Sequence, residues 1–374
     1  MLFLHTIKGK MTDKRNFRNL LLHRLGNGWA ALFIPVLLLL SSCNNGNEKT
    51  PDVSNIHVDL RTAHFDRDLY AIDTNNIGAG LKQLYTKYPD FLNYFLDTVM
   101  AYGIHGNYSD TVQGIREGLK PFLSFKDFKD LEDSIKSHYP DTRATDEKLA
   151  AGFKLMKHYF PGYTVPKIIY LNMGLSNWPA FPVDSNTFCI GLDMFLGDNF
   201  PYQAVGVPYY MRLHLHEDYI PVSVFGAIYK GMHPFKPDEK TLLDLMLQRG
   251  REQYYLHKIL PGTPDSVMFG FTQTQLDWCN ANEALVYNFF IHQNLLYNKD
   301  AHSVMPYVTD GPFARGLEPV SDTVKITPGN IGTWFGYKVI SAYMAQHPAM
   351  PLTELLNREV DPARVLDEAK YKPK

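Results

Sequence analysis

Cysteine is scarce in this chain, with three residues among 374. That number excludes the small extracellular folds that depend on a dense disulfide framework. Cys189 lies in an apolar run and Cys279 lies where a helix is expected to begin. Two cysteines could pair in an oxidising compartment, but these positions favour two buried thiols. The third residue, Cys43, belongs to the N-terminal signal described below.

Nucleotide-binding motifs and internal repeats are also missing. The sequence contains neither a G-x-G-x-x-G pattern nor a P-loop. The net charge is −2, and it falls to about −7 once the basic residues 1–42 are set aside, because 31 basic and 38 acidic residues remain. Since no basic cluster survives, the sequence predicts no nucleic-acid partner. It predicts no cofactor either.

The N-terminus has the pattern of an export signal. Residues 29–40 form an apolar run that is too short to span a bilayer comfortably and that suits the hydrophobic part of a signal peptide. The run ends in Leu40-Ser-Ser-Cys43, the lipobox pattern of bacterial lipoproteins. We therefore predict a signal peptide over residues 1–42, lipid attachment (diacylglycerol and palmitate) at Cys43, and a polar tether over residues 43–55. An uncleaved anchor with a chance cysteine is the alternative.

The predicted lipid fixes the expected location. A lipid at Cys43 would attach the chain to a membrane in place of a transmembrane helix. Asn44 follows the cysteine where an aspartate would signal inner-membrane retention, by analogy with known sorting rules. We expect a periplasm-facing protein of the cell envelope, with the outer membrane favoured.

The remainder of the chain reads as one α+β domain that is predominantly helical. Its composition, 45% hydrophobic and 20% charged, is that of a globular protein. We predict a single domain over residues 56–374 with a helical N-terminal subregion over residues 56–160. Alternating or continuous apolar runs predict strands, and breaker-bounded periodic segments predict helices. The expected strands are 56–60, 166–172, 179–183 and 187–195; the expected helices are 76–88, 90–102, 109–122, 125–138, 146–160, 222–232, 238–260, 272–297 and 328–344.

The last of these helices carries a distinctive pattern of small and large residues. Gly332 and Gly336 are four apart and would permit another helix to approach closely. A second set at the same spacing predicts a face buried in the core: Ile331, Phe335, Val339 and Tyr343.

Residues 186–262 run in the order edge strand, loop, helix, second helix. This order resembles the core of a zincin-type zinc peptidase, which implies a small zincin-like sheet packed on helices. In such enzymes the first helix carries H-E-x-x-H, because that spacing puts both histidines on one helical face. Here residues 222–232 contain neither His nor Glu, and Arg249 stands just before Gly250, where we expect the third ligand. The resemblance therefore implies a degenerate, non-catalytic scaffold without a metal.

The alternative is a periplasmic metal-dependent hydrolase with an unorthodox site. His214 and His216 would share one face of an extended segment, with Glu217 beside them. The simpler interpretation is that both histidines make ordinary hydrogen bonds in a tyrosine-rich loop.

Polar residues of a possible cleft lie in several segments. Trp278, Asn282 and Glu283 come close together on one helix, either facing a cleft or forming a solvated edge. We expect Tyr229 to point toward the position that a metal would occupy, with Arg249 nearby. Arg249 must meet an acceptor, and Asp193 or Glu283 is the expected partner. Two further candidates come from the loop, Tyr209 and Arg212.

The ordered set of segments resembles the gliding-motility lipoprotein GldB family of bacteria with a type IX secretion system. The resemblance implies an envelope lipoprotein that works with other gliding or secretion proteins. Arg249-Gly-Arg251 is more basic than the family pattern. A binding protein that holds a peptide or glycan against the Leu192 strand is a further hypothesis. The residues that carry the resemblance are the lipobox at Cys43, Phe65-Asp-Arg-Asp-Leu69, Ile190-Gly-Leu-Asp-Met-Phe-Leu-Gly197, Pro208-Tyr209 with Arg212, Leu243-Asp-Leu-Met with Gly250, Trp278-Cys-Asn-Ala-Asn-Glu283 and Gly332-Thr-Trp-Phe-Gly-Tyr337.

Overall fold

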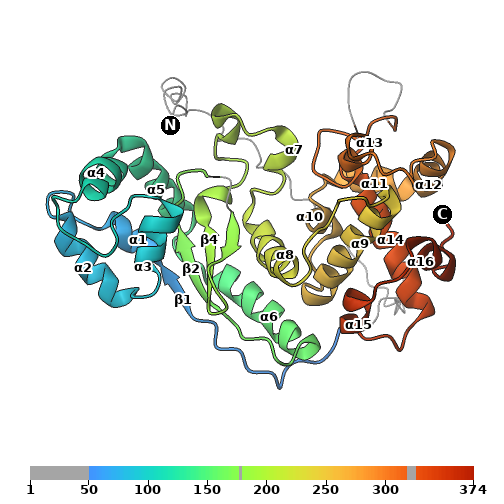
Figure 1. The fold of residues 1–374 in the computed structure, drawn as a ribbon, viewed down its shortest axis with the longest axis horizontal. Helices are drawn as coiled ribbons and strands as arrows, with labels where there is room; N and C mark the ends of the chain where they lie inside the picture. The colour runs from blue at the N-terminus through green and yellow to red at the C-terminus, as the bar shows by residue number, and fades with distance from the viewer. Residues whose placement is uncertain (1–49, 177–178, 318–325) are drawn as a thin grey trace, which may run out of the picture. The chain divides into compact units, whose positions relative to one another are not determined.

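A computed structural model describes residues 50–176, 179–317 and 326–374, and within it Asp52–Lys374 form one compact unit. The predicted class is confirmed, since a small sheet is packed among many helices (Figure 1). The strands are β1 (Thr62–His64), β2 (Lys167–Leu171), β3 (Ala180–Pro182) and β4 (Thr187–Gly191). The helices are α1 (Phe65–Tyr70), α2 (Ile77–Lys87), α3 (Leu92–Tyr94), α4 (Lys120–Ser124), α5 (Lys126–His138), α6 (Arg143–Tyr159), α7 (Tyr209–Arg212), α8 (Ile220–Met232), α9 (Leu242–Ile259), α10 (Asp265–Phe269), α11 (Gln273–Ala281), α12 (Glu283–His292), α13 (Ala301–Val304), α14 (Ile331–Gln346), α15 (Leu352–Asn357) and α16 (Pro362–Glu368).

The sheet has the order β1-β2-β4-β3, with the first three strands parallel and β3 antiparallel at the edge. Its first strand is not where the alternation in residues 56–60 predicted it. Pairing with β2 begins only at Thr62, opposite Ile168. Val58 and Leu60 lie in a segment without regular secondary structure, and their side chains pack against the core. The alternating pattern therefore reflects burial and not a strand.

The sheet separates two hydrophobic cores. Because side chains alternate along a strand, one face carries one set of residues and the other face the next set. The smaller core receives Ile169, Leu171 and Cys189 and is closed by α1 to α4, which lie on one side of the sheet in Figure 1. The larger core receives Ile168 and Tyr170 and is closed by α5, α6, α8 and α9. Cys189 and Cys279 are both buried free thiols, as predicted.

Three carboxylates are buried beyond the carboxyl ends of the parallel strands. Asp66 follows β1, Asp193 follows β4, and Glu132 comes from α5; each is at most 1% exposed. Burial raises the pKa of Glu132 and raises that of Asp193 to about 6, with the nearby Asp66 adding to both effects. Asp193 accepts hydrogen bonds from the backbone N–H groups of Met173 and Leu175, at 3.1 and 2.6 Å. Asp193 therefore anchors the chain that leaves β2. The strand β4 ends at Gly191, and not at residue 195 as predicted.

Helices α9 and α14 cross at their glycines. A Cβ atom on Gly336 would overlap the Met246 carbonyl oxygen, and one on Gly250 would overlap the Gly336 carbonyl oxygen. The close approach expected of Gly336 is thereby confirmed. The predicted core face of α14 is confirmed as well, with each of the following at most 2% exposed: Ile331, Phe335, Val339 and Tyr343.

The predicted helix over residues 272–297 is divided in two. Asn282 leaves helical geometry, with φ −120° and ψ 26°, and separates α11 from α12. Its side-chain amide donates to the Trp278 carbonyl oxygen at 2.8 Å, which satisfies an acceptor at the end of α11. An asparagine side chain that bonds to a nearby backbone carbonyl competes with helix continuation, and this explains the break.

The signal peptide and Cys43 lie outside the described residues, so their predictions remain untested. Within the described ranges, no helix combines the length and apolar character needed to cross a bilayer.

The α9–α14 crossing predicts a sharp difference between two glycine substitutions. Gly336→Ala should lower the free energy of unfolding by about 2 kcal/mol, because the added methyl has no room. Gly231→Ala in α8 is the matched control, because no atom lies within 4 Å of its Cβ position. It should be neutral or stabilise by about 0.5 kcal/mol. Urea denaturation measures both, and equal effects of the two variants would contradict the crossing.

Candidate functional site

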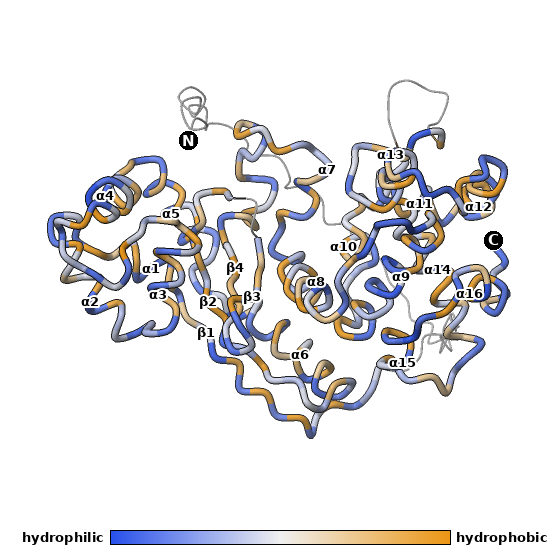
Figure 2. The backbone as a smooth tube through the Cα atoms, viewed as in Figure 1, coloured by the Kyte–Doolittle hydropathy of each residue, from blue (hydrophilic) through white to orange (hydrophobic). Residues whose placement is uncertain are grey.

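The candidate site lies between α8 and α9. Helix α8 begins with Pro221 in its first turn, which favours helix initiation. The helix is mostly apolar, as Figure 2 shows, and Phe225 packs its ring against that of Phe153 with centroids 5.0 Å apart. The apolar face holds α8 against α6 and the sheet edge β3. Gly226 and Lys230 of α8 both lie close to the Glu252 carboxylate of α9.

Helix α9 contributes a buried carboxylate. Its start is fixed by a reciprocal capping arrangement, in which the Thr241 side chain accepts from the Asp244 N–H and Asp244 accepts from the Thr241 N–H. Two turns further on, Glu252 is only 8% exposed. Arg249 donates to its Oε2 atom over 2.9 Å, and Lys230 Nζ lies 3.5 Å from its Oε1 atom. Two cations therefore hold one carboxylate, and this satisfies a group that would be costly to bury alone.

Gly226 of α8 lies next to the Glu252 carboxylate and, having no side chain, leaves space beside it. A Cβ atom on Gly226 would lie 3.8 Å from Oε1, and no other atom comes as near to that Cβ position. Gly226 and Lys230 are one turn apart on α8, so both face the same oxygen. The Arg249 guanidinium lies over the ring of Phe235, whose centre is 4.0 Å from the guanidinium carbon.

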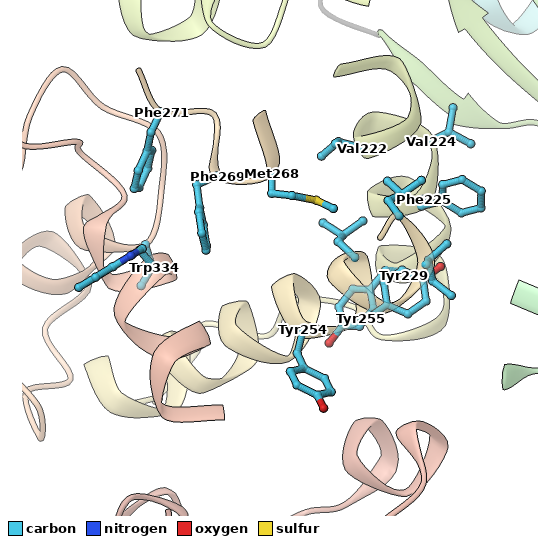
Figure 3. Close-up of a cluster of buried hydrophobic side chains, with 14 of the residues drawn as sticks. Val222, Val224, Phe225, Tyr229, Tyr254, Tyr255, Met268, Phe269, Phe271 and Trp334 are labelled. Atoms are coloured by element: carbon cyan, nitrogen blue, oxygen red, sulfur yellow. The ribbon is translucent and has the colours of Figure 1, made fainter. Parts of the chain in front are cut away.

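Aromatic rings close the other side of the site. Figure 3 shows Tyr229 of α8 and Tyr255 of α9 lying together between the two helices. Their ring centroids are 5.2 Å apart, and His233 lies 5.1 Å from Tyr229. Burial raises the pKa of Tyr229, and the negative charge of Glu252 raises it further. Tyr229 is therefore a neutral phenol beside an ion pair.

The expected partner of Arg249 was wrong. Its carboxylate is Glu252, three residues later on the same helix, rather than Asp193 or Glu283. Asp193 is occupied by two backbone N–H groups. Glu283 accepts from the Tyr371 hydroxyl at 2.6 Å and lies 3.6 Å from Lys338. The acidic residue of α9 is therefore Glu252, three positions after residue 249, where the zincin pattern would place the third ligand.

His214 and His216 have different partners in the structure. His214 Nδ1 lies 3.5 Å from an Asp310 oxygen, and its ring stacks on Tyr219 with centroids 4.6 Å apart. His216 Nε2 lies 3.4 Å from an Asp198 oxygen. Burial lowers the pKa of His214, which favours its neutral form.

Glu217, the third residue of the alternative metal site, accepts from the Thr145 hydroxyl at 3.0 Å. The partners of these three residues therefore come from three separate segments. Among the residues that the structure describes, no group of three or more His, Cys, Asp or Glu side chains is arranged to hold a metal ion.

The other cleft candidates do not gather around Arg249. Tyr209 and Arg212 lie on the short α7, where the guanidinium carbon is 5.3 Å from the Tyr209 ring centre and Tyr209 is 59% exposed. Trp278 and Asn282 mark the end of α11, and Glu283 begins α12. Of the candidates, the structure brings together Tyr229 and Arg249, and it adds Lys230, Phe235 and Glu252. A search for charges one turn apart would have found Glu252, because it follows Arg249 by three residues.

A family model described as gliding motility protein GldB matches residues 46–373. No curated protein and no solved structure gives a match.

The ion pair in the site predicts a stability difference. Arg249→Ala leaves Glu252 with only the more distant Lys230, so it should lower the free energy of unfolding by about 2 to 3 kcal/mol. Arg116→Ala is the control, because both side chains of its pair with Glu117 are exposed to solvent and the variant should leave the stability almost unchanged. Chemical denaturation measures both variants. Equal losses would place Arg249 in solvent and contradict the site.

Proposed function

Because the chain belongs to the gliding motility protein GldB family, whose members are gliding-associated lipoproteins, we propose that it acts non-catalytically in the gliding and type IX secretion apparatus of the cell envelope. The match begins three residues after Cys43 and extends almost to the C-terminus. The proposal concerns the whole domain and its lipid anchor together.

The Glu252 site supports the non-catalytic part of the proposal. In a zincin, two histidines one helical turn apart face a third ligand on the next helix. In this chain Gly226 and Lys230 have that spacing and face Glu252. We interpret the Lys230 ammonium and the Arg249 guanidinium as fixed positive charges that replace a metal cation beside the carboxylate. Neither provides an open coordination position at which water could be activated.

The short predicted tether supports a position close to the membrane. Val53 already packs against the larger core, ten residues after Cys43. Ten extended residues span at most about 35 Å. A lipid at Cys43 would therefore hold the domain within reach of membrane-bound partners, facing the periplasm with the outer membrane favoured.

Lipidation is tested in cells of a gliding strain that lacks its own copy of the gene. We expect the wild-type chain to incorporate a labelled fatty acid and to restore gliding. Cys43→Ala should lose the label completely and lose most of the restored motility, because the anchor is removed. Undiminished label in Cys43→Ala would disprove lipidation at this residue.

Variants expressed in the same strain distinguish the non-catalytic role from the alternative metal-dependent hydrolase. His216→Ala and Glu217→Gln alter residues that the alternative metal site would need, and both side chains are partly exposed. We expect each variant to restore gliding to the wild-type level, with immunoblots confirming equal amounts of protein. Motility lost in both variants at normal protein levels would favour the hydrolase.

A further inference from the structure

Two cations lie side by side at the amino ends of the parallel strands. The register pairs Thr62 of β1 with Ile168 of β2, so the residues just before them are neighbours as well. These residues are Arg61 and Lys167. The Ile168 N–H donates to the Arg61 carbonyl oxygen at 2.9 Å, which continues the pairing to this end of the sheet. Because adjacent strands lie about 4.8 Å apart, the two side chains leave the same face of the sheet next to each other.

The row of side chains continues on β4 and reaches a tyrosine ring. Lys167 pairs with Thr187 of β4, so these two side chains are also neighbours on that face. It is the face of the smaller core, because Ile169, two residues after Lys167, is buried there. Lys167 Nζ lies 5.0 Å from the centre of the Tyr88 ring, and Lys87 Nζ lies 5.5 Å from the same centre. Three cations and a hydroxyl from four separate segments therefore lie along one edge of the smaller core.

The carboxylate near these cations is already occupied. Asp68 Oδ2 accepts from Lys87 Nζ and from the Tyr88 hydroxyl, each at 2.5 Å. Among the residues that the structure describes, neither Arg61 nor Lys167 forms an ion pair. Burial lowers the pKa of Lys167, and the charges of Arg61 and Lys87 lower it further. Three cations beside one carboxylate thus leave two positive charges unmatched.

The four side chains of the row can be reached from solvent. Arg61 and Lys87 are exposed, and Lys167 and Thr187 are partly exposed. An anion can therefore approach them without any opening of the core. No run of basic residues marks this cluster in the sequence, because strand pairing and the packing of Tyr88 bring its members together.

We propose that Arg61, Lys167 and Thr187 bind a phosphate group, with Lys87 at the edge of the site. A guanidinium presents two parallel N–H donors that match two oxygens of a phosphate. The lysine adds a compact positive charge, and the threonine adds a hydroxyl donor. A phosphate monoester carries about −1.5 to −2 charges at pH 7, which suits two unmatched cations better than a singly charged carboxylate does.

The phosphate can belong to a phospholipid headgroup or to a soluble molecule. The lipid source rests on the proposed anchoring at Cys43, which would hold the domain beside a membrane surface. The soluble source does not depend on that anchor. Fatty-acid labelling tests the anchor by itself, so its failure and a failure of the phosphate site are distinguishable.

The test is isothermal titration calorimetry at pH 7, in which inorganic phosphate is added to the full-length protein in a nonionic detergent. We expect saturable binding by the wild type and roughly tenfold weaker binding by both Arg61→Gln and Lys167→Gln, because each variant loses a charge-assisted contact. Arg61→Lys keeps the charge but loses the two-pronged geometry, so its affinity should lie between those of Arg61→Gln and the wild type.

The matched control is Lys129→Gln, which removes an equal charge at an exposed position of α5. This helix contacts the other end of the sheet, where its Glu132 accepts from the Asn172 side chain just beyond β2. Lys129→Gln should bind phosphate as the wild type does.

A water-soluble lipid with the same phosphate group, dihexanoyl phosphatidate, distinguishes the two sources. Dihexanoyl phosphatidylcholine corrects for partition into the detergent. Tighter binding of phosphatidate than of inorganic phosphate assigns the site to a lipid headgroup, and equal or weaker binding assigns it to a soluble phosphate. The proposal is overturned by wild-type affinity in Arg61→Gln or Lys167→Gln, by an equal loss in Lys129→Gln, by no saturable binding up to about 10 mM phosphate, or by acetate that binds as tightly as phosphate.

Discussion

The close crossing of α9 and α14 is the constraint on which the rest of the structure depends. It requires glycine at residues 250 and 336, because any side chain would meet the backbone of the other helix. With Gly250 held against α14, the rotation of α9 about its axis is fixed. Successive helical residues are about 100° apart, so Arg249 and Arg251 must leave on opposite flanks. Arg249 reaches Glu252 over 2.9 Å, whereas Arg251 leaves on the other flank.

This arrangement gives the two arginines different roles. Arg249 is matched by a carboxylate on its own helix and covered by Phe235, so it contributes to stability. Among the described residues, no acceptor meets the buried Nε atom of Arg251.

The sequence predicted the fold class well because the strands and core helices are strongly apolar. The continuous run over residues 166–172 and the spacing of Ile331, Phe335 and Val339 both reflect burial directly. It failed where burial occurs without regular structure, as at Val58, and where one side chain ends a helix, as at Asn282. Both failures have a local cause, and the spacing of hydrophobic residues carries no information about it.

The candidate site was only partly predictable. The sequence placed Tyr229 and Arg249 in it, but the acidic partner was expected on another segment instead of one turn along the same helix, so Glu252 was missed. The approach of Lys230 to the same carboxylate depends on how α8 packs against α9, which the sequence pattern does not contain. The two histidines shared a face only on the assumption of an extended segment. The chain instead turns at α7 and directs them to Asp310 and Asp198.

The proposed non-catalytic role rests on the interpretation that Lys230 and Arg249 place fixed positive charges beside Glu252 in the role of a metal cation. Its most direct test is to exchange them for ligands, in the double variant Gly226→His, Lys230→His. The two histidines would be one turn apart and face Glu252, a set that binds zinc. Elemental analysis after dialysis should find about one zinc per chain in this variant, little in the parent, and far less when Glu252→Gln is added. A folded double variant that binds no more zinc than the parent would contradict the account.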